Sequence, residues 1–361
     1  MRVSFIIGYG VPKFSILLRP HGSCYLCRPM CSSSTSALTT SQKPRTSLFL
    51  RPPTHSATLS DLQKWQNWAK NLASSVGSTF VDLDNGPDST LLRRELKWLV
   101  EDVTEDGSIS AEQQRNIRLR VSLEELYKLW KQRIEERRPF QYIVGCEHWR
   151  DLVLCVEEGV LIPRPETEKL VDLVADVVSD NQGLREGLWA DMGTGTGAIA
   201  IGIGMILRSY GRIIATDLSP LAVGVATFNV QRHGLQDVIE IRQGSWFEPL
   251  KDVEGKLAGI VSNPPYIPSD HISGLQAEVG RHEPKMALDG GVNGMNDLLH
   301  LCKGAASMLK PGGFLAFETN GEKQCKHLVE YMETNAGGIF CDVNLVPDFA
   351  GVHRFVTAFH K

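Results

Sequence analysis

The stretch Leu188-Trp-Ala-Asp-Met-Gly-Thr-Gly-Thr-Gly-Ala198 decides the fold of this 361-residue chain. It begins as a short apolar strand, continues as a glycine-rich loop and leads into an apolar helix over 199–207. A strand, a glycine loop and a helix in direct succession make the first half of a nucleotide-binding βαβ unit. A second strand over 212–217 ends in Asp217, where a carboxylate can accept both hydroxyls of a ribose. The sequence therefore predicts an α/β fold with a ligand at the carboxyl ends of parallel strands.

The glycine spacing indicates which ligand this is. Gly193, Gly195 and Gly197 follow the pattern Gly-x-Gly-x-Gly, whereas dinucleotide binders have Gly-x-Gly-x-x-Gly. Asp191 lies two residues before the first glycine, where it can reach an ammonium group. S-adenosylmethionine has ribose hydroxyls and an amino-acid end but no pyrophosphate. The loop therefore suits S-adenosylmethionine better than NAD, although the loop alone leaves both open.

Two motifs follow later strands. Trp246 comes after the third strand, at a position where an indole can flank an adenine ring. Asn263-Pro-Pro-Tyr266 directly follows the strand 257–262. Two prolines stiffen this turn because each fixes φ and removes a donor. The Asn263 oxygen and the Pro264 carbonyl then remain as two acceptors beside the flat ring of Tyr266.

Two hydrogen-bond acceptors beside an aromatic ring fit a planar –NH2 group on an sp2 carbon. A glutamine amide and the exocyclic amine of adenine or cytosine are such groups. We therefore expect Asn263, Pro264 and Tyr266 to be the catalytic residues, with Pro265 completing the substrate site. No metal and no nucleophilic side chain are expected, because in-line positioning supplies most of the rate enhancement.

Residues 1–60 differ in composition from the rest of the chain. They contain seven Lys or Arg and 17 Ser or Thr but no Asp or Glu. A basic, hydroxyl-rich and acid-free stretch is typical of an organelle transit peptide, whereas a secretory signal needs a longer apolar run. We therefore expect residues 1–57 to be a disordered mitochondrial transit peptide, and the mature protein to lie in the matrix.

The remaining chain divides into three parts. Amphipathic patterns over 58–138 predict a small all-helical substrate-docking domain, with one helix opened by the capping box Ser122-Leu-Glu-Glu125 and another expected over 109–119. Residues 148–156 alternate in a β-rich pattern, so residues 139–165 are expected to form a hairpin linker. Residues 166–361 are expected to be the catalytic domain. The last strands of its seven-stranded sheet are expected at 313–318, 339–345 and 354–359.

Four segments of the chain resemble the HemK-type protein glutamine methyltransferases, which modify peptide-chain release factors. These segments are Gln141–Gly145, Leu161–Glu168, Asp191–Gly197 and Asn263–Ile267, and the likeness covers roughly residues 60–361. The resemblance implies a seven-stranded Rossmann-like domain that transfers methyl from S-adenosylmethionine to the Gln of a Gly-Gly-Gln motif. It also implies a helical N-terminal domain that grips the release factor.

The resemblance assigns roles to individual positions. The cofactor would be bound by Asp191, Gly193, Thr194, Gly195, Thr196, Gly197, Asp217, Trp246 and Asn263. The substrate glutamine would lie against Asn263, Pro264, Pro265 and Tyr266. Two positions depart from the family pattern: Glu318-Thr-Asn-Gly321 is one residue longer than Glu-x-Gly, and His353 replaces an Asp. We expect both departures to lie away from the main motifs.

Charge separates the competing functions. A DNA or RNA amino-group methyltransferase is the alternative, because Asn-Pro-Pro-Tyr also serves adenine, and a catalytically silent adaptor is a third possibility. A base-flipping enzyme needs a basic groove, but residues 61–361 have 31 Lys and Arg against 42 Asp and Glu, a net charge of −11. This acidity argues against nucleic acid as the direct substrate and suits a basic protein partner. No run of 18 apolar residues occurs, so no membrane span is expected.

Overall fold

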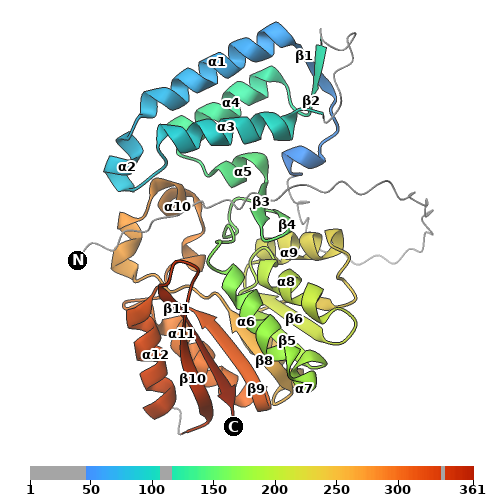
Figure 1. Cartoon of the computed structure of the whole chain (residues 1–361), viewed down its shortest axis with the longest axis vertical. Coiled ribbons are helices and arrows are strands. Elements are labelled where there is room, and N and C mark those ends of the chain that lie inside the picture. Colours follow the sequence, from blue (N-terminus) through green and yellow to red (C-terminus); the bar gives the residue numbers. More distant parts are fainter. Residues whose placement is uncertain (1–45, 106–115, 335–337) are drawn as a thin grey trace, which may run out of the picture. The chain divides into compact units, whose positions relative to one another are not determined.

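One seven-stranded sheet organises the catalytic part of the chain (Figure 1). The computed structural model describes residues 46–105, 116–334 and 338–361. The strand order is β10-β11-β9-β8-β5-β6-β7, in which β9, β8, β5, β6 and β7 are parallel and β11 is antiparallel to both β9 and β10. The strands are β5 (Leu188–Met192), β6 (Arg212–Asp217), β7 (Ile239–Gln243), β8 (Leu257–Ser262), β9 (Leu309–Glu318), β10 (Phe340–Pro347) and β11 (His353–His360). The expected doubly covered α/β sheet with a final antiparallel pair is confirmed.

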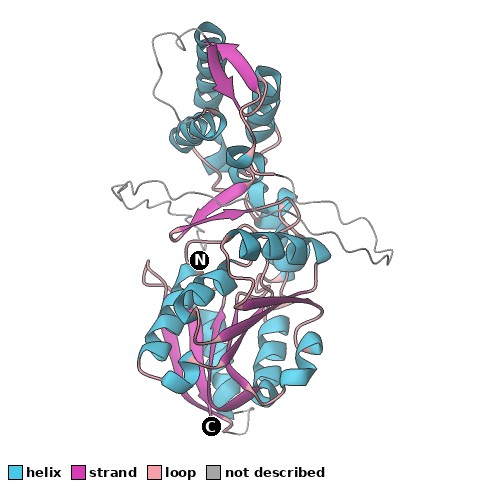
Figure 2. Cartoon of the chain, turned by 90° about the vertical axis from the view of Figure 1, so that its right-hand side faces the viewer, coloured by secondary structure: helices cyan, strands magenta, loops and turns pink. Residues whose placement is uncertain are grey.

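Helices cover both faces of this sheet (Figures 1 and 2). Successive side chains of a strand point to opposite faces. On β9, Phe314 and Ala316 therefore pack on one face, in the core that includes residues of α6 (Glu168–Ser179) and α8 (Ala198–Leu207). Leu315 and Phe317 pack on the other face, in the core that includes residues of α11 (Asn296–Met308) and α12 (Glu322–Thr334). The helices are α6 (Glu168–Ser179), α7 (Gln182–Arg185), α8 (Ala198–Leu207), α9 (Pro220–Arg232), α10 (Ala277–His282), α11 (Asn296–Met308) and α12 (Glu322–Thr334).

The helical region before this sheet has a hydrophobic core of its own. Trp65 and Trp130 are fully buried in it, and the Trp130 indole Nε1 donates to the Ala69 carbonyl at 3.0 Å. The elements of this region are a 3-10 turn at Leu48–Leu50, β1 (His55–Thr58), α1 (Leu59–Val76), α2 (Thr79–Asp84), α3 (Ser89–Val103), β2 (Asn116–Leu119) and α4 (Leu123–Glu135). Trp68 and Trp98 are partly buried and pack against the same core.

Side-chain caps fix where the long helices begin. At the start of each of these helices, a side-chain oxygen accepts the backbone N–H of the residue three positions later. The capping residues are Thr58 for α1, Asp88 for α3 and Ser122 for α4. Ser122 is the cap that the sequence predicts. Its capping-box partner Glu125 instead pairs with Arg51, at 3.0 Å between Nη1 and Oε1.

The helix expected over 109–119 is wrong for its last four residues. Asn116–Leu119 form β2, which pairs antiparallel with β1. Residues 106–115 lie outside the described residues. Because β2 is stabilised by a strand about 60 positions earlier in the chain, no local pattern reports it.

The predicted leader overlaps the packed body. Leu48 and Ala57 are buried in the helical core, and the Ser47 hydroxyl donates to the Gly145 carbonyl at 2.6 Å. Residues 46–57, which the expected leader includes, are therefore part of the fold. The rest of the predicted leader, residues 1–45, lies outside the described residues.

The expected hairpin between the two parts is present. A short helix, α5 (Phe140–Val144), ends at Gly145 with φ of 77°, and β3 (Cys146–Trp149) pairs antiparallel with β4 (Leu152–Cys155). Within the described ranges, no helix is long and apolar enough to cross a membrane.

Candidate active site

The predicted motifs lie at one edge of the sheet, at the ends of four neighbouring parallel strands. Strands β5, β6, β8 and β9 end at Met192, Asp217, Ser262 and Glu318. The Ser262 hydroxyl donates to the Met192 carbonyl at 2.6 Å and so joins the ends of β8 and β5. The glycine loop, Asp217 and the Asn263 turn therefore meet at the carboxyl edge, where open α/β sheets bind ligands.

The loop after β5 needs its glycines. Gly193, Gly195 and Gly197 have φ of 73°, 56° and 84°, a left-handed conformation that residues with a Cβ rarely adopt. A Cβ on Gly197 would lie 3.4 Å from the Ala226 Cα of α9, so α9 also packs closely on the loop. The Gly195 N–H donates to Asp217 Oδ2 at 2.9 Å. The loop and the acid at the end of β6 thus form one unit, as predicted.

Asp191 lies beneath the loop and has one carboxyl oxygen available. Its Oδ2 accepts from the Thr194 hydroxyl at 2.6 Å and from the Ala200 N–H at 3.0 Å. Its Oδ1 is buried and has no hydrogen-bond partner within the part of the chain that the structure describes. Burial raises the pKa of Asp191 to about 7, and the two hydrogen bonds oppose that rise. A buried acceptor without a donor fits a ligand that supplies one, such as an ammonium group.

The two threonines of the loop, which are expected to bind the cofactor, also have a structural role. Thr194 and Thr196 are 5% and 2% exposed. Thr194 holds Asp191 as described, and the Thr196 carbonyl accepts from Asn229 Nδ2 at 2.9 Å. Their side chains shape the loop from inside, so a ligand would meet mainly its backbone.

Trp246 lies beside the glycine loop. A Cβ on Gly193 would be 3.5 Å from the Trp246 ring, and the ring centroid is 6.5 Å from that of His300. Trp246 adopts a φ of 43°, which is uncommon outside glycine. The backbone after β7 thus turns the indole toward the loop, where it could cover one side of an adenine ring.

The Asn263 side chain has a defined orientation. Its Nδ2 donates to the Thr167 Oγ1 at 3.1 Å, across 96 residues of sequence. Because the amide nitrogen is used in this bond, the amide oxygen is the atom available to accept from a ligand. The predicted acceptor at Asn263 is therefore compatible with the structure.

Tyr266 is held at its side-chain hydroxyl and at its backbone. Its hydroxyl donates to Glu318 Oε1 at 3.0 Å, and its carbonyl accepts from Gln324 Nε2 at 2.8 Å. Burial, together with the nearby Glu318, raises the pKa of Tyr266 well above its usual range, so this hydroxyl stays protonated. Pro264 and Pro265 lie between Asn263 and Tyr266 and hold the two side chains apart.

The Leu161–Glu168 segment packs against the residues that follow the Asn263 turn. The Arg164 guanidinium pairs with Glu283 at 2.5 Å, and the Ile162 N–H donates to the same carboxylate at 3.2 Å. Thr167 at the end of this segment reaches Asn263. These two segments resemble the same family, and in the structure they build one wall of the site.

The expectation that the two departures from the family pattern lie away from the main motifs is wrong. Glu318 contacts Tyr266 directly, and the Asn320 N–H donates to Oε1 of Gln324, the residue that holds the Tyr266 carbonyl. The Thr319 N–H donates to the Arg354 carbonyl at 2.8 Å. The extra residue after β9 and the changed start of β11 therefore meet each other next to the site.

Sequence reasoning missed three residues of this site: Thr167, Glu318 and Gln324. Thr167 lies within the Leu161–Glu168 motif and Glu318 within a departure from the family pattern, and neither has a predicted role of its own. The available signal was that Glu318 is an acid at the carboxyl end of a parallel strand, the same position that marks Asp217 on β6.

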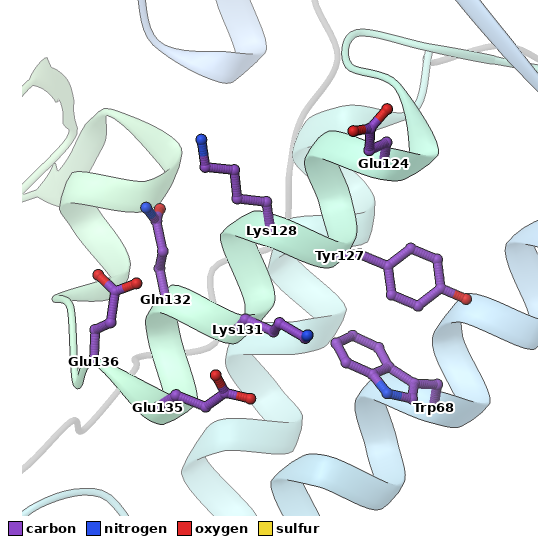
Figure 3. A pocket seen from close by; sticks show the side chains of 8 residues that line it. All are labelled: Trp68, Glu124, Tyr127, Lys128, Lys131, Gln132, Glu135 and Glu136. Carbon is purple, nitrogen blue, oxygen red and sulfur yellow. The ribbon is translucent and has the colours of Figure 1, made fainter.

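A hollow lies on the helical region, between α1 and α4 (Figure 3). The rings of Trp68 and Tyr127 lie 4.6 Å apart between their centroids. The remaining lining residues are charged or polar: Glu124, Lys128, Lys131, Gln132, Glu135 and Glu136. No residue of the strand-end site lines it.

The fold and this site define a class of protein. Residues 169–277 match the family model described as "Methyltransferase small domain". Together with the glycine loop and the Asn263 turn, this match makes the chain an S-adenosylmethionine-dependent methyltransferase. The residues fit that cofactor: Asp191 offers a buried acceptor, Asp217 a carboxylate and Trp246 a ring face.

The relatives identify the family. "Release factor glutamine methyltransferase" of Thermosynechococcus vestitus is 37% identical over 300 residues, which is 82% of this chain and 97% of that protein. The protein of the same name from Synechocystis is 38% identical over 271 residues, covering 73% and 89%. This chain belongs to the release factor glutamine methyltransferase family. A solved structure, the "hMettl16 catalytic domain in complex with MAT2A 3'UTR hairpin 6", is similar with a TM-score of 0.47 at 14% identity, covering 66% of this chain and 80% of that one.

Proposed function

We propose that this chain methylates the side-chain nitrogen of the glutamine in the Gly-Gly-Gln motif of mitochondrial peptide-chain release factors. Two facts support the proposal. The similarity to a release factor glutamine methyltransferase spans 97% of that relative. The site presents acceptor groups beside an aromatic ring, which suits a planar amide.

The observation that carries the proposal is the hydrogen bond from Asn263 Nδ2 to Thr167. It leaves the Asn263 oxygen free to accept one N–H of a substrate amide, and the Pro264 carbonyl can accept the other. An amide nitrogen is a weak nucleophile because its lone pair is conjugated, as the roughly 18–20 kcal/mol rotation barrier of a peptide bond shows. Two acceptors stabilise the positive charge that develops on this nitrogen as it bonds the methyl group. The nitrogen replaces the sulfur on that methyl, so that S-adenosylhomocysteine is left, and then releases one proton to water.

Positioning contributes the larger share of the barrier reduction. When bound at the glycine loop, S-adenosylmethionine supplies an electrophilic methyl group on a positive sulfur. Tyr266, held by Glu318 and Gln324, restricts the amide plane from one side. In-line alignment of two reactants supplies up to roughly 7–11 kcal/mol. The chain therefore needs no acid, base or metal of its own to align the nitrogen with the methyl.

Methyl transfer with labelled cofactor tests this function. The full chain is incubated with methyl-labelled S-adenosylmethionine and either a release factor, the same factor with Gln→Ala in its Gly-Gly-Gln motif, or duplex DNA. We expect label only in the unaltered release factor, with mass spectrometry placing one methyl group on that glutamine. Label in DNA but not in protein would make the chain a nucleic-acid amino-group methyltransferase instead.

We also propose that the helical region, residues 58–138, holds the body of the release factor. Trp68 and Tyr127 form a partly exposed aromatic pair there, bordered by charged residues. Tyr127→Ala is expected to raise the KM for a whole release factor several-fold and to leave methylation of a short Gly-Gly-Gln peptide unchanged. An equal loss of methylation with the whole release factor and with the short peptide would contradict the proposed docking role.

Import into an organelle is the proposed route to the substrate. The acid-free, hydroxyl-rich composition of residues 1–60 supports import, and the mitochondrial matrix is the expected destination. A plastid is the second candidate, because both relatives named above are cyanobacterial proteins and plastids descend from cyanobacteria. Import into isolated mitochondria and chloroplasts distinguishes the two. Since Leu48 is buried, we expect the processed protein to begin before Thr46.

A further inference from the structure

The Gln324 side chain is buried beside the turn after β8 and joins several segments. It lies in the first turn of α12 and is 9% exposed. Its Nε2 donates to the Tyr266 carbonyl at 2.8 Å, and to the Asn293 and Gly294 carbonyls at 3.2 Å each. Its Oε1 accepts from the Asn320 N–H at 2.8 Å. Since every partner of the nitrogen is an acceptor and the partner of the oxygen is a donor, the amide has one favourable orientation.

The two ends of this amide serve different parts of the molecule. The oxygen binds an N–H just before α12, and a similar bond fixes the start of a helix in a capping box. The nitrogen instead lies between three carbonyl groups from two segments, the turn at Tyr266 and the loop over residues 290–294. Buried carbonyl oxygens that converge in this way repel each other unless a donor lies between them. The NH2 group of Gln324 therefore holds the 290–294 loop against the turn.

The 290–294 loop packs directly on the backbone of the turn. A Cβ on Gly290 would lie 2.6 Å from the Pro265 carbonyl oxygen and 2.8 Å from the Tyr266 Cα, so this position has no room for a side chain. The Gly290 N–H also donates to the Ile267 carbonyl at 2.9 Å. The loop therefore fixes the peptide group between Pro265 and Tyr266.

The direction of the Pro264 carbonyl depends on this contact. Proline fixes φ at about −65°, and a residue before a proline favours extended backbone, so Pro264 has polyproline II geometry. This geometry has three residues per turn, so the carbonyls of Pro264 and Pro265 point about 120° apart. Because the Pro265 carbonyl lies against Gly290, the Pro264 carbonyl points elsewhere and is available to a ligand. A shift of the loop would turn both carbonyls.

We propose that Gln324 is a positioning residue for methyl transfer, because its NH2 group holds the 290–294 loop against the turn and so directs the Pro264 carbonyl at the substrate amide. The inference rests on the proposed function, in which that carbonyl accepts one N–H of a glutamine. Gln324 acts through the loop and the turn. Its loss is therefore expected to misalign the reacting nitrogen, which lowers turnover, and to leave the affinity for both reactants nearly unchanged.

Two variants of the full chain disturb the loop by different routes. Gln324→Met keeps the length of the side chain but removes the donor, and Gly290→Ala keeps Gln324 but places a Cβ against the Pro265 carbonyl. In both, we expect kcat for a release factor to fall about ten- to a hundredfold, since a displacement of about 1 Å can cost a hundredfold. The KM for the release factor and the Kd for S-adenosylmethionine are expected to remain within about twofold.

Gly274→Ala is the matched control. Gly274 follows the same turn, and a Cβ there would meet no atom of the described residues within 4 Å, so kcat is expected to stay unchanged.

The outcomes separate the inference from the proposed function. Unchanged kcat in Gln324→Met or in Gly290→Ala would overturn the inference, as would a loss of cofactor affinity as large as the loss of turnover in both. If Gln324→Met does not fold, Gly290→Ala decides by the same criteria. All of these results leave the proposed function intact, whereas failure of the unaltered chain to methylate the Gly-Gly-Gln glutamine would overturn the proposed function itself.

Discussion

Asn263 and Thr167 are joined by a hydrogen bond of 3.1 Å between Nδ2 and Oγ1, although 96 residues separate them in the chain. The bond connects the turn after β8 to the start of α6. It orients the amide side chain on which the proposed chemistry depends. The site is thus built from two segments whose contact depends on the packing of α6 against the sheet.

Removal of the Tyr266 hydroxyl is expected to weaken the pH dependence of turnover. Burial raises the pKa of Glu318 to about 7, while Tyr266 lowers it by donating a hydrogen bond, Arg354 also lowers it and Glu166 raises it. The ionised Glu318 accepts the hydrogen bond that holds Tyr266 in the site, so kcat is expected to fall as pH drops through about 7. Tyr266→Phe lacks this hydrogen bond, so its kcat is expected to be lower and to respond less to pH in this range. The measurement is kcat at saturating substrates between about pH 6 and pH 9.

Glu318→Gln is the matched control for that profile. It removes the titrating group and should flatten the decline near neutral pH. An unchanged decline in Glu318→Gln would assign the titration to another residue.

Asp191 is expected to govern the affinity for S-adenosylmethionine. Its pKa of about 7 follows from burial, so its carboxylate is ionised above that pH and protonated below it. The Kd for the cofactor should therefore rise as pH falls below about 7, by at most about tenfold per pH unit. Asp191→Asn should weaken binding about ten- to a hundredfold, the effect of one hydrogen bond to a charged group. Calorimetric titration checks both, and a pH dependence that persists in Asp191→Asn would speak against this role.

A buried charge cluster joins the helical region to α10, and its loss should destabilise the fold. Arg133 lies 2.6 Å from Glu95 and 2.9 Å from Glu278 between the nearest nitrogen and oxygen atoms, and all three side chains are at least 90% buried. Arg133→Met leaves these carboxylates short of a partner and is expected to lower the free energy of unfolding by about 3–5 kcal/mol. Urea denaturation measures the change.

The exposed pair of Lys64 and Asp61 provides the control for that prediction. Their side chains are 71% and 46% exposed, so Lys64→Met is expected to change the unfolding free energy by less than about 1 kcal/mol. Similar losses in Arg133→Met and Lys64→Met would mean that burial of the cluster does not determine its contribution.

The main features of the fold could be predicted because they rest on local patterns. Each motif identifies the segment before it as a strand: the glycine loop identifies 188–192, and the Asn-Pro-Pro-Tyr turn identifies 257–262. Because the strands are parallel, both motifs are expected at the same edge of the sheet. The strand β2 could not be predicted, because β1 stabilises it from a distant part of the chain. Glu318 has a local signal, because it is an acid at the end of a predicted strand, but its partner Tyr266 follows from the order of the strands in the sheet. The contact of Thr167 with Asn263 follows from the packing of α6, which leaves no local pattern.

Asn263→Ala tests the central claim, that the Asn263 oxygen accepts from the substrate amide during methyl transfer. We expect kcat for a release factor to fall about a hundred- to a thousandfold, the usual effect of losing one group that stabilises developing charge. Asn263 is also expected among the cofactor-binding residues, but in the structure its amide nitrogen bonds Thr167 and not the glycine loop. The Kd for S-adenosylmethionine, measured with the same preparation, is therefore expected to remain within about twofold, since the glycine loop, Asp191 and Asp217 are intact. Turnover close to that of the unaltered chain, or a loss of cofactor affinity as large as the loss of turnover, would contradict the role given to Asn263.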